Sequence, residues 1–175
     1  KKFYYFGPMF RREKPQTGRL RQFHQVGIEI FDEKNPFNDV ESILIAEKFL
    51  KLLGIRDKIK LEINTLGNLE SRKNYISDLV KFLKKNISRL SSESKKKLET
   101  NPLRILDSKN NEDKEVIEES PKILNFLDDE SNFFFEAVLN NLKKLNIEFS
   151  VNPYLVRGLD YYNDTAFEFV TFEDK

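Results

Sequence analysis

The chain has 175 residues, and its 30 lysines and arginines nearly balance its 29 aspartates and glutamates, which leaves a net charge of +1. With no cysteine and a single histidine, the composition excludes disulfides, thiolate metal sites and metal sites built from several histidines. Bulk charge gives no indication of nucleic-acid binding. No secretory leader is visible, and no apolar run reaches about 18 residues, so we expect no membrane span.

Two strand-like segments joined by a loop open the chain. The first is the aromatic run KKFYYFGPMF, the loop EKPQTG carries proline and glycine, and the second segment begins at Arg19. Alternate residues of a strand face opposite sides of a sheet, so the odd positions from Arg19 to Glu29 share one face. The even positions turn apolar from Val26 onward and are predicted to pack on a core, with His24 buried among them. The sequence therefore predicts an antiparallel hairpin with a long basic tip.

The odd face of the second strand carries side chains suited to binding a ligand, namely Arg19, Arg21, Phe23, Gln25 and Glu29, with Gly27 among them. Guanidinium groups hold phosphate oxygens through paired hydrogen bonds, and an aromatic ring offers a stacking face to a purine. A glycine leaves room where another group approaches closely. This face predicts a nucleotide beside a second, amine-bearing substrate. The alternative is a half-exposed hairpin whose charges are solvated.

Helices and strands are predicted for the rest of the chain. Residues 35–54 predict a helix that ends at a glycine, and IKLEINTLG predicts the next strand. Residues 71–86 predict a second helix, and the lysine-, glutamate- and serine-rich region from about residue 88 to 128 predicts short helices broken by prolines. A helix over 131–145 and the strand-like runs IEFSV and YYNDTAFEFVTF follow. This order predicts an α+β fold, with an antiparallel sheet interrupted by a helical insertion.

Two stretches of the sequence resemble the histidyl-tRNA synthetase family of class II aminoacyl-tRNA synthetases. FGPMFRREKPQTGRLRQFHQVGIEIF resembles motif 2, whose pattern of Arg-x-Glu, a variable loop and Arg-x-x-x-Phe matches Arg11, Glu13, Arg19 and Phe23. LVRGLDYYNDTAFEF, at residues 155–169, resembles the histidine-specific motif of the same family. The segments LEINTLG and TNPLRILDSKN between them also fit, so the resemblance covers essentially the whole chain.

The resemblance implies an α+β fold that is part of a class II antiparallel catalytic sheet with a helical insertion domain. We expect core segments over residues 1–68 and 151–175 and the insertion over 69–150. Because the sequence begins at a lysine and TFEDK directly follows a strand-like run, we also expect a fragment of a longer protein. The fragment alone is expected to be inactive, and the complete protein is expected to be a cytoplasmic homodimer.

The activity that the resemblance implies is that of a histidine–tRNA ligase. Such an enzyme uses ATP, accompanied by Mg²⁺, to convert L-histidine to histidyl-adenylate, and then transfers the histidyl group to the 3′ end of tRNA(His). The Mg²⁺ ligands are expected outside this chain. The first step brings two negatively charged reactants together, so catalysis is mostly positioning and charge stabilisation. An arginine-rich site suits that task.

The resemblance also implies roles for single residues. Arg11 and Arg157 are implied to be catalytic and to contact the α-phosphate, Arg157 where related enzymes use a metal ion. For the rest of ATP, Arg19 is implied to bind the γ-phosphate, Phe23 to stack on adenine and Glu13 to lie near the adenine amino group. The residues implied to hold the substrate histidine are Gln25, Glu29, Arg157, Tyr161 and Tyr162. No metal ligand is expected in this chain.

Two other functions remain open. One is that of a non-catalytic histidine-binding paralogue, such as the regulatory subunit of ATP phosphoribosyltransferase. The other is that of a stress-kinase regulatory module that binds uncharged tRNA. The helical insertion and the intact Arg11, Glu13, Arg19 and Arg157 favour the synthetase over the first. The motifs of the second are usually degenerate, and the intact motifs of this chain favour the synthetase over it.

Overall fold

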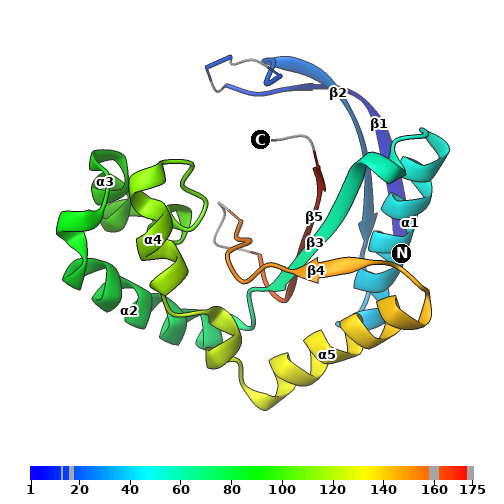
Figure 1. The fold of residues 1–175 in the computed structure, drawn as a ribbon. Helices are drawn as coiled ribbons and strands as arrows, with labels where there is room; N and C mark the ends of the chain where they lie inside the picture. Colours follow the sequence, from blue (N-terminus) through cyan, green and yellow to red (C-terminus); the bar gives the residue numbers. More distant parts are fainter. Residues whose placement is uncertain (13, 16–17, 158–161, 173–175) are drawn as a thin grey trace.

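The computed structural model describes residues 1–12, 14–15, 18–157 and 162–172 (Figure 1). Within them the strands form a two-stranded sheet, β1 (Lys2–Phe10) and β2 (Gln22–Ile30), and a three-stranded sheet, β3 (Ile59–Thr65), β4 (Phe149–Val151) and β5 (Thr165–Thr171). The α-helices are α1 (Pro36–Leu52), α2 (Leu69–Lys85), α3 (Ser92–Thr100), α4 (Asn111–Glu119) and α5 (Asp129–Lys144). Short 3₁₀ helices are η1 (Arg56–Lys58), η2 (Ile87–Arg89), η3 (Pro102–Ile105) and η4 (Ile123–Phe126).

The predicted antiparallel pairing holds for the hairpin and for two strands of the second sheet. β1 pairs with β2 from Lys2 opposite Ile30 to Phe10 opposite Gln22, and β5 pairs antiparallel with β3 along its whole length. β4 is the exception, because it runs parallel to β3. Parallel neighbours need a long crossover connection, and the helices from α2 to α5 provide it here.

The even face of β2 is less buried than the sequence predicted. Its end meets α1, where Ile28 and Ile30 line a pocket with Ile45. Farther along the hairpin, Val26 is 47% exposed and His24 is exposed as well. The prediction that His24 is a packed core residue is therefore wrong, because α1 follows β2 directly and covers only the near end of this face. The His24 ring lies beside Phe6, with 6.1 Å between the ring centroids.

One hydrophobic core joins the three-stranded sheet to α1 and α5. The side chains of Ile43 in α1, Leu61 in β3 and Leu142 in α5 are fully buried in it. Burying one such side chain contributes about 1.5–3 kcal/mol. α1 begins where Asn35 accepts a hydrogen bond from the backbone of the second helical residue, and it ends at Leu52, two residues before Gly54, whose φ of +70° favours glycine. The helix predicted over residues 35–54 is confirmed, and it is shorter than predicted, by one residue at its start and two at its end.

A second hydrophobic core lies inside the group of helices from α2 to η4, which we call the helical body. Its buried side chains include Tyr75 and Leu79 of α2, Leu98 of α3 and Val116 of α4. Figure 1 shows α2, α3 and α4 gathered on one side of the three-stranded sheet, with the hairpin on the other. α5 and β4 contribute to the core of the sheet instead. The insertion boundaries at 69 and 150 stay a prediction.

Candidate functional site

The odd positions of both hairpin strands form one face. The antiparallel register sets four pairs on it: Phe3 with Glu29, Tyr5 with Gly27, Gly7 with Gln25, and Met9 with Phe23. Phe23, Gln25 and Gly27 are half-buried, whereas the residues that alternate with them at the even positions, His24 and Val26, are exposed. The face that the sequence predicted for ligand binding is thus the more enclosed of the two here.

Tyr5 fixes the middle of this face. The Gln25 side chain donates a hydrogen bond from Nε2 to the Tyr5 hydroxyl at 2.8 Å. The Tyr5 ring also lies over Gly27, where an added Cβ would be 2.2 Å from the nearest ring carbon. The space that the sequence predicted at Gly27 for an approaching group is therefore occupied by the Tyr5 side chain. Because Gly27 lets the ring lie flat on β2, the tyrosine hydroxyl reaches Gln25 and orients its amide.

Arg11 and Phe23 are in contact at the tip end of the same face. The central guanidinium carbon of Arg11 lies 3.9 Å from the centroid of the Phe23 ring, a cation–π contact. The Arg11 backbone N–H donates to the carbonyl of Arg21 at 2.8 Å, which holds the start of the tip closed. The side chain expected to bind phosphate therefore lies directly on the ring expected to stack on adenine.

The other expected hairpin residues lie at the two extremes of the face. Arg19 is exposed at the tip, and Glu29 is exposed at the opposite end, where it pairs with Phe3. Glu29 lies six positions after Phe23 along β2, which corresponds to roughly 20 Å at about 3.4 Å per residue. This length accommodates two ligands side by side. Glu13 lies outside the described residues.

Arg157 is anchored on the second sheet. Its Nη2 donates to the carbonyl of Phe167 at 2.5 Å, in the middle of β5. Two residues upstream, the carbonyl of Leu155 accepts a hydrogen bond of 3.0 Å from Nδ2 of Asn64, a fully buried residue of β3. The chain that presents Arg157 is therefore held by β3 just before it and by β5 through the guanidinium itself.

Tyr162 is held by the helical body. Its carbonyl accepts a hydrogen bond from Nη1 of Arg72, a buried arginine in the first turns of α2. The Tyr162 side chain is partly exposed. Tyr161 lies outside the described residues. The expected histidine-specific residue is thus fixed through its backbone, by a residue from a distant segment.

One cavity connects the hairpin with β5. It measures about 380 Å³ and is lined by Val26, Gly27 and Ile28 of β2, by Ser42, Ile45, Ala46 and Phe49 of α1, and by Phe167. Phe167 also supplies the carbonyl that accepts the hydrogen bond from Arg157. Arg157 is therefore hydrogen-bonded to a residue, Phe167, that lines the same cavity as Gly27 of the hairpin.

Comparison with known proteins shows the family of this chain. The sequence model of a family described as Histidyl-tRNA synthetase matches residues 1–174. The chain belongs to the histidyl-tRNA synthetase family.

Relatives in this family share both sequence and fold with the chain. It is 54% identical over 170 residues to the histidine–tRNA ligases of Streptococcus pneumoniae strains 70585 and Hungary19A-6, which covers 97% of this chain and 39% of each ligase. A crystal structure of apo histidyl-tRNA synthetase from S. aureus matches with a TM-score of 0.70 at 37% identity, over 96% of this chain and 38% of that one. The expected α+β fold is confirmed, and the chain spans 39% of the length of these ligases.

Among the residues expected from the histidyl-tRNA synthetase motifs, the structure brings Arg11 and Phe23 together and places Gln25 on the same face. Arg157 and Tyr162 are held by β5 and by α2, respectively. Their roles stay predictions. Two supporting residues were not expected, Tyr5 and Arg72. Tyr5 could have been found from the hairpin register, which sets it opposite Gly27.

Charged groups surround the start of β5, next to Tyr162. The Lys34 ammonium lies 3.1 Å from a carboxylate oxygen of Asp164 and 3.4 Å from Glu130. Burial by itself lowers the pKa of Lys34, but these two carboxylates outweigh it and raise the pKa. Burial raises the pKa of Asp39 nearby, an effect that Asp164 increases while the side chain of Thr165 and Lys34 oppose it. This cluster ties the loop after β2, the start of α1 and the start of β5 together.

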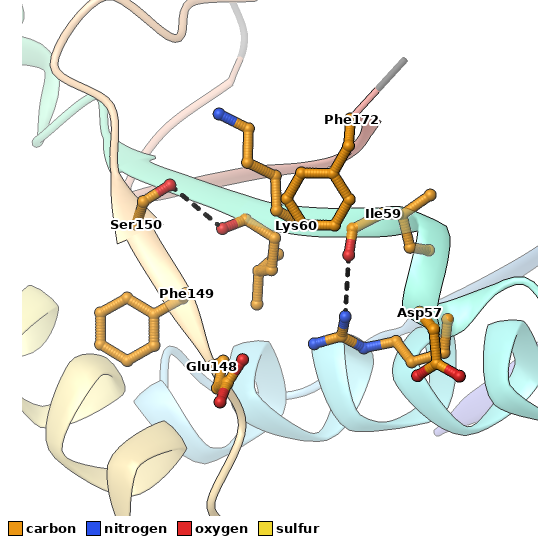
Figure 2. Close-up of a pocket in the computed structure, with 9 residues that line it drawn as sticks. Asp57, Ile59, Lys60, Glu148, Phe149, Ser150 and Phe172 are labelled. Carbon is orange, nitrogen blue, oxygen red and sulfur yellow. Dashed lines mark hydrogen bonds between the residues drawn. The ribbon is translucent and has the colours of Figure 1, made fainter.

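A second cavity, of about 440 Å³, lies at the other edge of the three-stranded sheet (Figure 2). Lys60 of β3, Phe149 and Ser150 of β4, and Phe172 line it, and Arg56 donates to the carbonyl of Ile59 at 2.8 Å beside it. None of the described residues expected to bind substrate is part of its lining. We therefore leave it outside the candidate site.

Residues 1–12, 14–15, 18–157 and 162–172 contain no group of three or more histidine and acidic side chains able to hold a metal ion. Nor does any helix in these ranges have the length and apolar character that crossing a membrane requires.

Proposed function

We propose that the complete protein to which this chain belongs is a histidine–tRNA ligase. It activates L-histidine with ATP to histidyl-adenylate and pyrophosphate, and transfers the histidyl group to the 3′ end of tRNA(His). The observation that carries the proposal is the hairpin face itself. Arg11 lies on the Phe23 ring there, and Tyr5 orients Gln25 on the same face, in a chain of the histidyl-tRNA synthetase family.

The tip half of the face suits ATP. A guanidinium and an aromatic ring in contact offer a partner for a phosphate and a partner for a purine within one side-chain length. We expect ATP to replace this contact, so that Arg11 moves onto the α-phosphate and the ring becomes available to adenine. Arg19, exposed at the tip, is proposed to reach the γ-phosphate. Glu13 is proposed to lie near the adenine amino group. Mg²⁺ is proposed to arrive with ATP and to be ligated outside this chain.

The opposite half of the face suits the amino acid. The Gln25 amide donates to Tyr5, so its side-chain oxygen is proposed to accept a hydrogen bond from the histidine ammonium group. Glu29, farther along the strand, adds a carboxylate for a second polar group of the substrate. Tyr161 and Tyr162 are proposed to complete the histidine pocket.

The reaction joins a carboxylate to a negatively charged phosphate, so like charges must be brought together. Arginines aimed at the α-phosphate lower this barrier, provided that they are already in place when the attack begins. Arg157 is proposed to be one of them. Its present partner is the carbonyl of Phe167, and a carbonyl is a weaker acceptor for a guanidinium than a phosphate oxygen. Binding of ATP is therefore expected to redirect this side chain.

ATP–pyrophosphate exchange tests the proposal in the complete protein, which we expect to be a cytoplasmic homodimer. Exchange that depends on L-histidine, and is absent with other amino acids, together with charging of tRNA(His), supports the ligase. Binding of histidine in calorimetry without any exchange supports the non-catalytic paralogue instead. Charging of tRNA separates the ligase from a module that only binds tRNA.

A further inference from the structure

Arg72 connects the helical body to the histidine-specific segment. It stands in α2, is 7% exposed, and donates from Nη1 to the carbonyl of Tyr162, 90 residues away in sequence. Its position continues the buried stripe of this helix, which is formed by Tyr75, Leu79 and Leu83. Positions 72, 75, 79 and 83 follow the spacing of one helix face. Arg72 therefore occupies a place where the pattern leads one to expect an apolar side chain.

A buried guanidinium is costly unless its N–H groups find acceptors. Within the described ranges, no carboxylate pairs with Arg72, and its side-chain hydrogen bond goes to a backbone carbonyl. A leucine or methionine would fill the same stripe at lower cost. An apolar side chain could not, however, hold the Tyr162 carbonyl. What the arginine contributes at this position is a fixed location for that carbonyl.

The base from which Arg72 reaches out is itself rigid. The starts of α2 and α5 are joined by hydrogen bonds. Asn68 caps α2 by accepting a hydrogen bond from the Ser71 N–H at 2.9 Å, and its own N–H donates to the Ser131 hydroxyl of α5 at 3.2 Å. Asp128 caps α5 and donates its N–H to the Ser71 hydroxyl at 3.1 Å. The side chains of Asn68 and Asp128 are also hydrogen-bonded, at 2.5 Å. Arg72 lies one residue beyond this joint.

The chain on the other side of Tyr162 is fixed as well. The Asp164 N–H donates to the carbonyl of Gly67 at 3.1 Å, and its carbonyl accepts from the Leu66 N–H at 2.7 Å. With residue 164 tied to the end of β3, the bond from Arg72 fixes the carbonyl two residues earlier. A carbonyl held in this way sets the direction in which the neighbouring side chain leaves the backbone.

We propose that Arg72 is a positioning residue for the amino-acid end of the site. It does not touch the substrate; it holds Tyr162 so that the tyrosine meets histidine, and it does so from the helical body. The inference rests on the proposed function, in which Tyr162 belongs to the histidine pocket. It predicts that histidine binding depends on a residue of α2, whereas ATP binding at the hairpin does not.

Steady-state pyrophosphate exchange in the complete protein tests this inference. Arg72→Ala is compared with the wild type and with Arg89→Ala, a matched control on the same body whose guanidinium pairs with Glu119 at 2.8 Å. Active sites are titrated first, so that rates refer to folded enzyme. We expect Arg72→Ala to raise the KM for histidine roughly tenfold, the size expected for losing one charge-assisted hydrogen bond. The KM for ATP should change less than twofold, and Arg89→Ala should match the wild type.

Arg72→Lys is the second variant. It keeps one donor for the carbonyl but not the planar geometry of the guanidinium, so the KM for histidine should rise only about threefold. If Arg72→Ala does not fold, this variant decides: an unchanged KM for histidine overturns the inference, and a selective rise supports it. If Arg72→Ala folds with lowered stability but an unchanged KM for histidine, Arg72 is merely structural and the inference is overturned. Absence of histidine-dependent exchange in the wild type overturns the proposed function and this inference together.

Discussion

The guanidinium of Arg11 covers the ring of Phe23, with 3.9 Å between the guanidinium carbon and the ring centroid. Two residues that we propose for different parts of ATP thus share one contact on the hairpin. The contact covers one face of the ring and holds the guanidinium on it, and we propose that ATP separates the two. Each of the two side chains can be tested separately.

Replacing Phe23 tests the adenine end. We expect Phe23→Ala to raise the KM for ATP in the complete protein, because loss of base–aromatic stacking costs about 1–3 kcal/mol. The KM for histidine should stay within twofold. Phe10→Ala is a matched control, because Phe10 lies at an even position of the same hairpin and is 74% exposed. An unchanged KM for ATP in a folded Phe23→Ala variant would remove Phe23 from the adenine site.

Gly27 and Gly7 form a pair of test positions on the same face. A Cβ at Gly27 would lie 2.2 Å from the Tyr5 ring, whereas a Cβ at Gly7 would meet nothing within 4 Å. Gly27→Ala must displace the ring and with it the hydroxyl that orients Gln25, so we expect a loss of about 1–3 kcal/mol in stability and weaker histidine binding. Thermal unfolding and histidine titration measure the two effects. Gly7→Ala should leave the stability unchanged, and equal losses of stability in the two variants would contradict the role of Tyr5.

Alternation along β2 was enough to predict which side chains share a face, since Phe23, Gln25 and Gly27 follow from the strand period alone. Alternation could not tell which face is the more buried. That depends on how far α1 extends beneath the hairpin, so the prediction for His24 was wrong. Arg72 could not be assigned either, because its partner lies 90 residues away and a local pattern carries no information on such a contact. The strand period predicts which side chains share a face, whereas tertiary packing determines which other elements that face contacts.

Glu29 tests the amino-acid end of the hairpin. A site built to make a hydrogen bond discriminates against ligands that cannot form it. Glu29→Gln should therefore weaken histidine binding roughly tenfold and change ATP binding little. Glu33→Gln is a control, because Glu33 is an exposed acid in the loop after β2. Separate titrations of ATP and histidine give the two constants. If the variant bound ATP more weakly and histidine with unchanged affinity, our assignment of the two ends of the face would be reversed.

Asp113 makes the helical body sensitive to acid. This carboxylate is fully buried and accepts hydrogen bonds from the side chains of Ser91, Ser94 and Ser108 at 2.6–2.9 Å, and from the Ser91 N–H at 2.8 Å. Burial by itself raises the pKa of Asp113, but the bonds from these serines outweigh it and lower the pKa below its usual value. The charged form is thus the one that the fold stabilises.

A lowered pKa in the folded state gives stability that is present above the unfolded pKa, near 3.9, and is lost as pH falls through the folded pKa. Asp113→Asn should therefore cost about 1.5–3 kcal/mol at pH 7, the value of losing hydrogen bonds to a charged acceptor. Unfolding of both proteins in urea, from pH 7 down to pH 3, measures the difference. The difference in unfolding free energy between the two proteins should narrow only at the acid end of this range. A gap that is constant over this range would show that the charge of Asp113 is not what stabilises the body.

Arg157 allows the most discriminating test of catalysis. Its guanidinium is held on the Phe167 carbonyl at 2.5 Å, and Asn64 anchors the chain two residues before it, so the side chain has a fixed starting position from which we expect ATP binding to redirect it. If it stabilises the charge that develops during attack on the α-phosphorus, its removal costs rate more than binding. An interaction made mainly in the transition state lowers kcat and kcat/KM alike and leaves KM nearly unchanged.

We expect Arg157→Ala in the complete protein to slow adenylation by about 10²–10³-fold, the typical cost of losing one preorganised donor. Histidine binding should persist. Arg157→Lys should recover little, because a point charge does not reproduce a planar fork with two donors. Pre-steady-state formation of adenylate at saturating ATP and histidine measures the step directly, and thermal unfolding controls for loss of the bond to Phe167. A burst rate like that of the wild type would leave Arg157 as an anchor of its own loop, and the case for a histidine-binding regulator would strengthen.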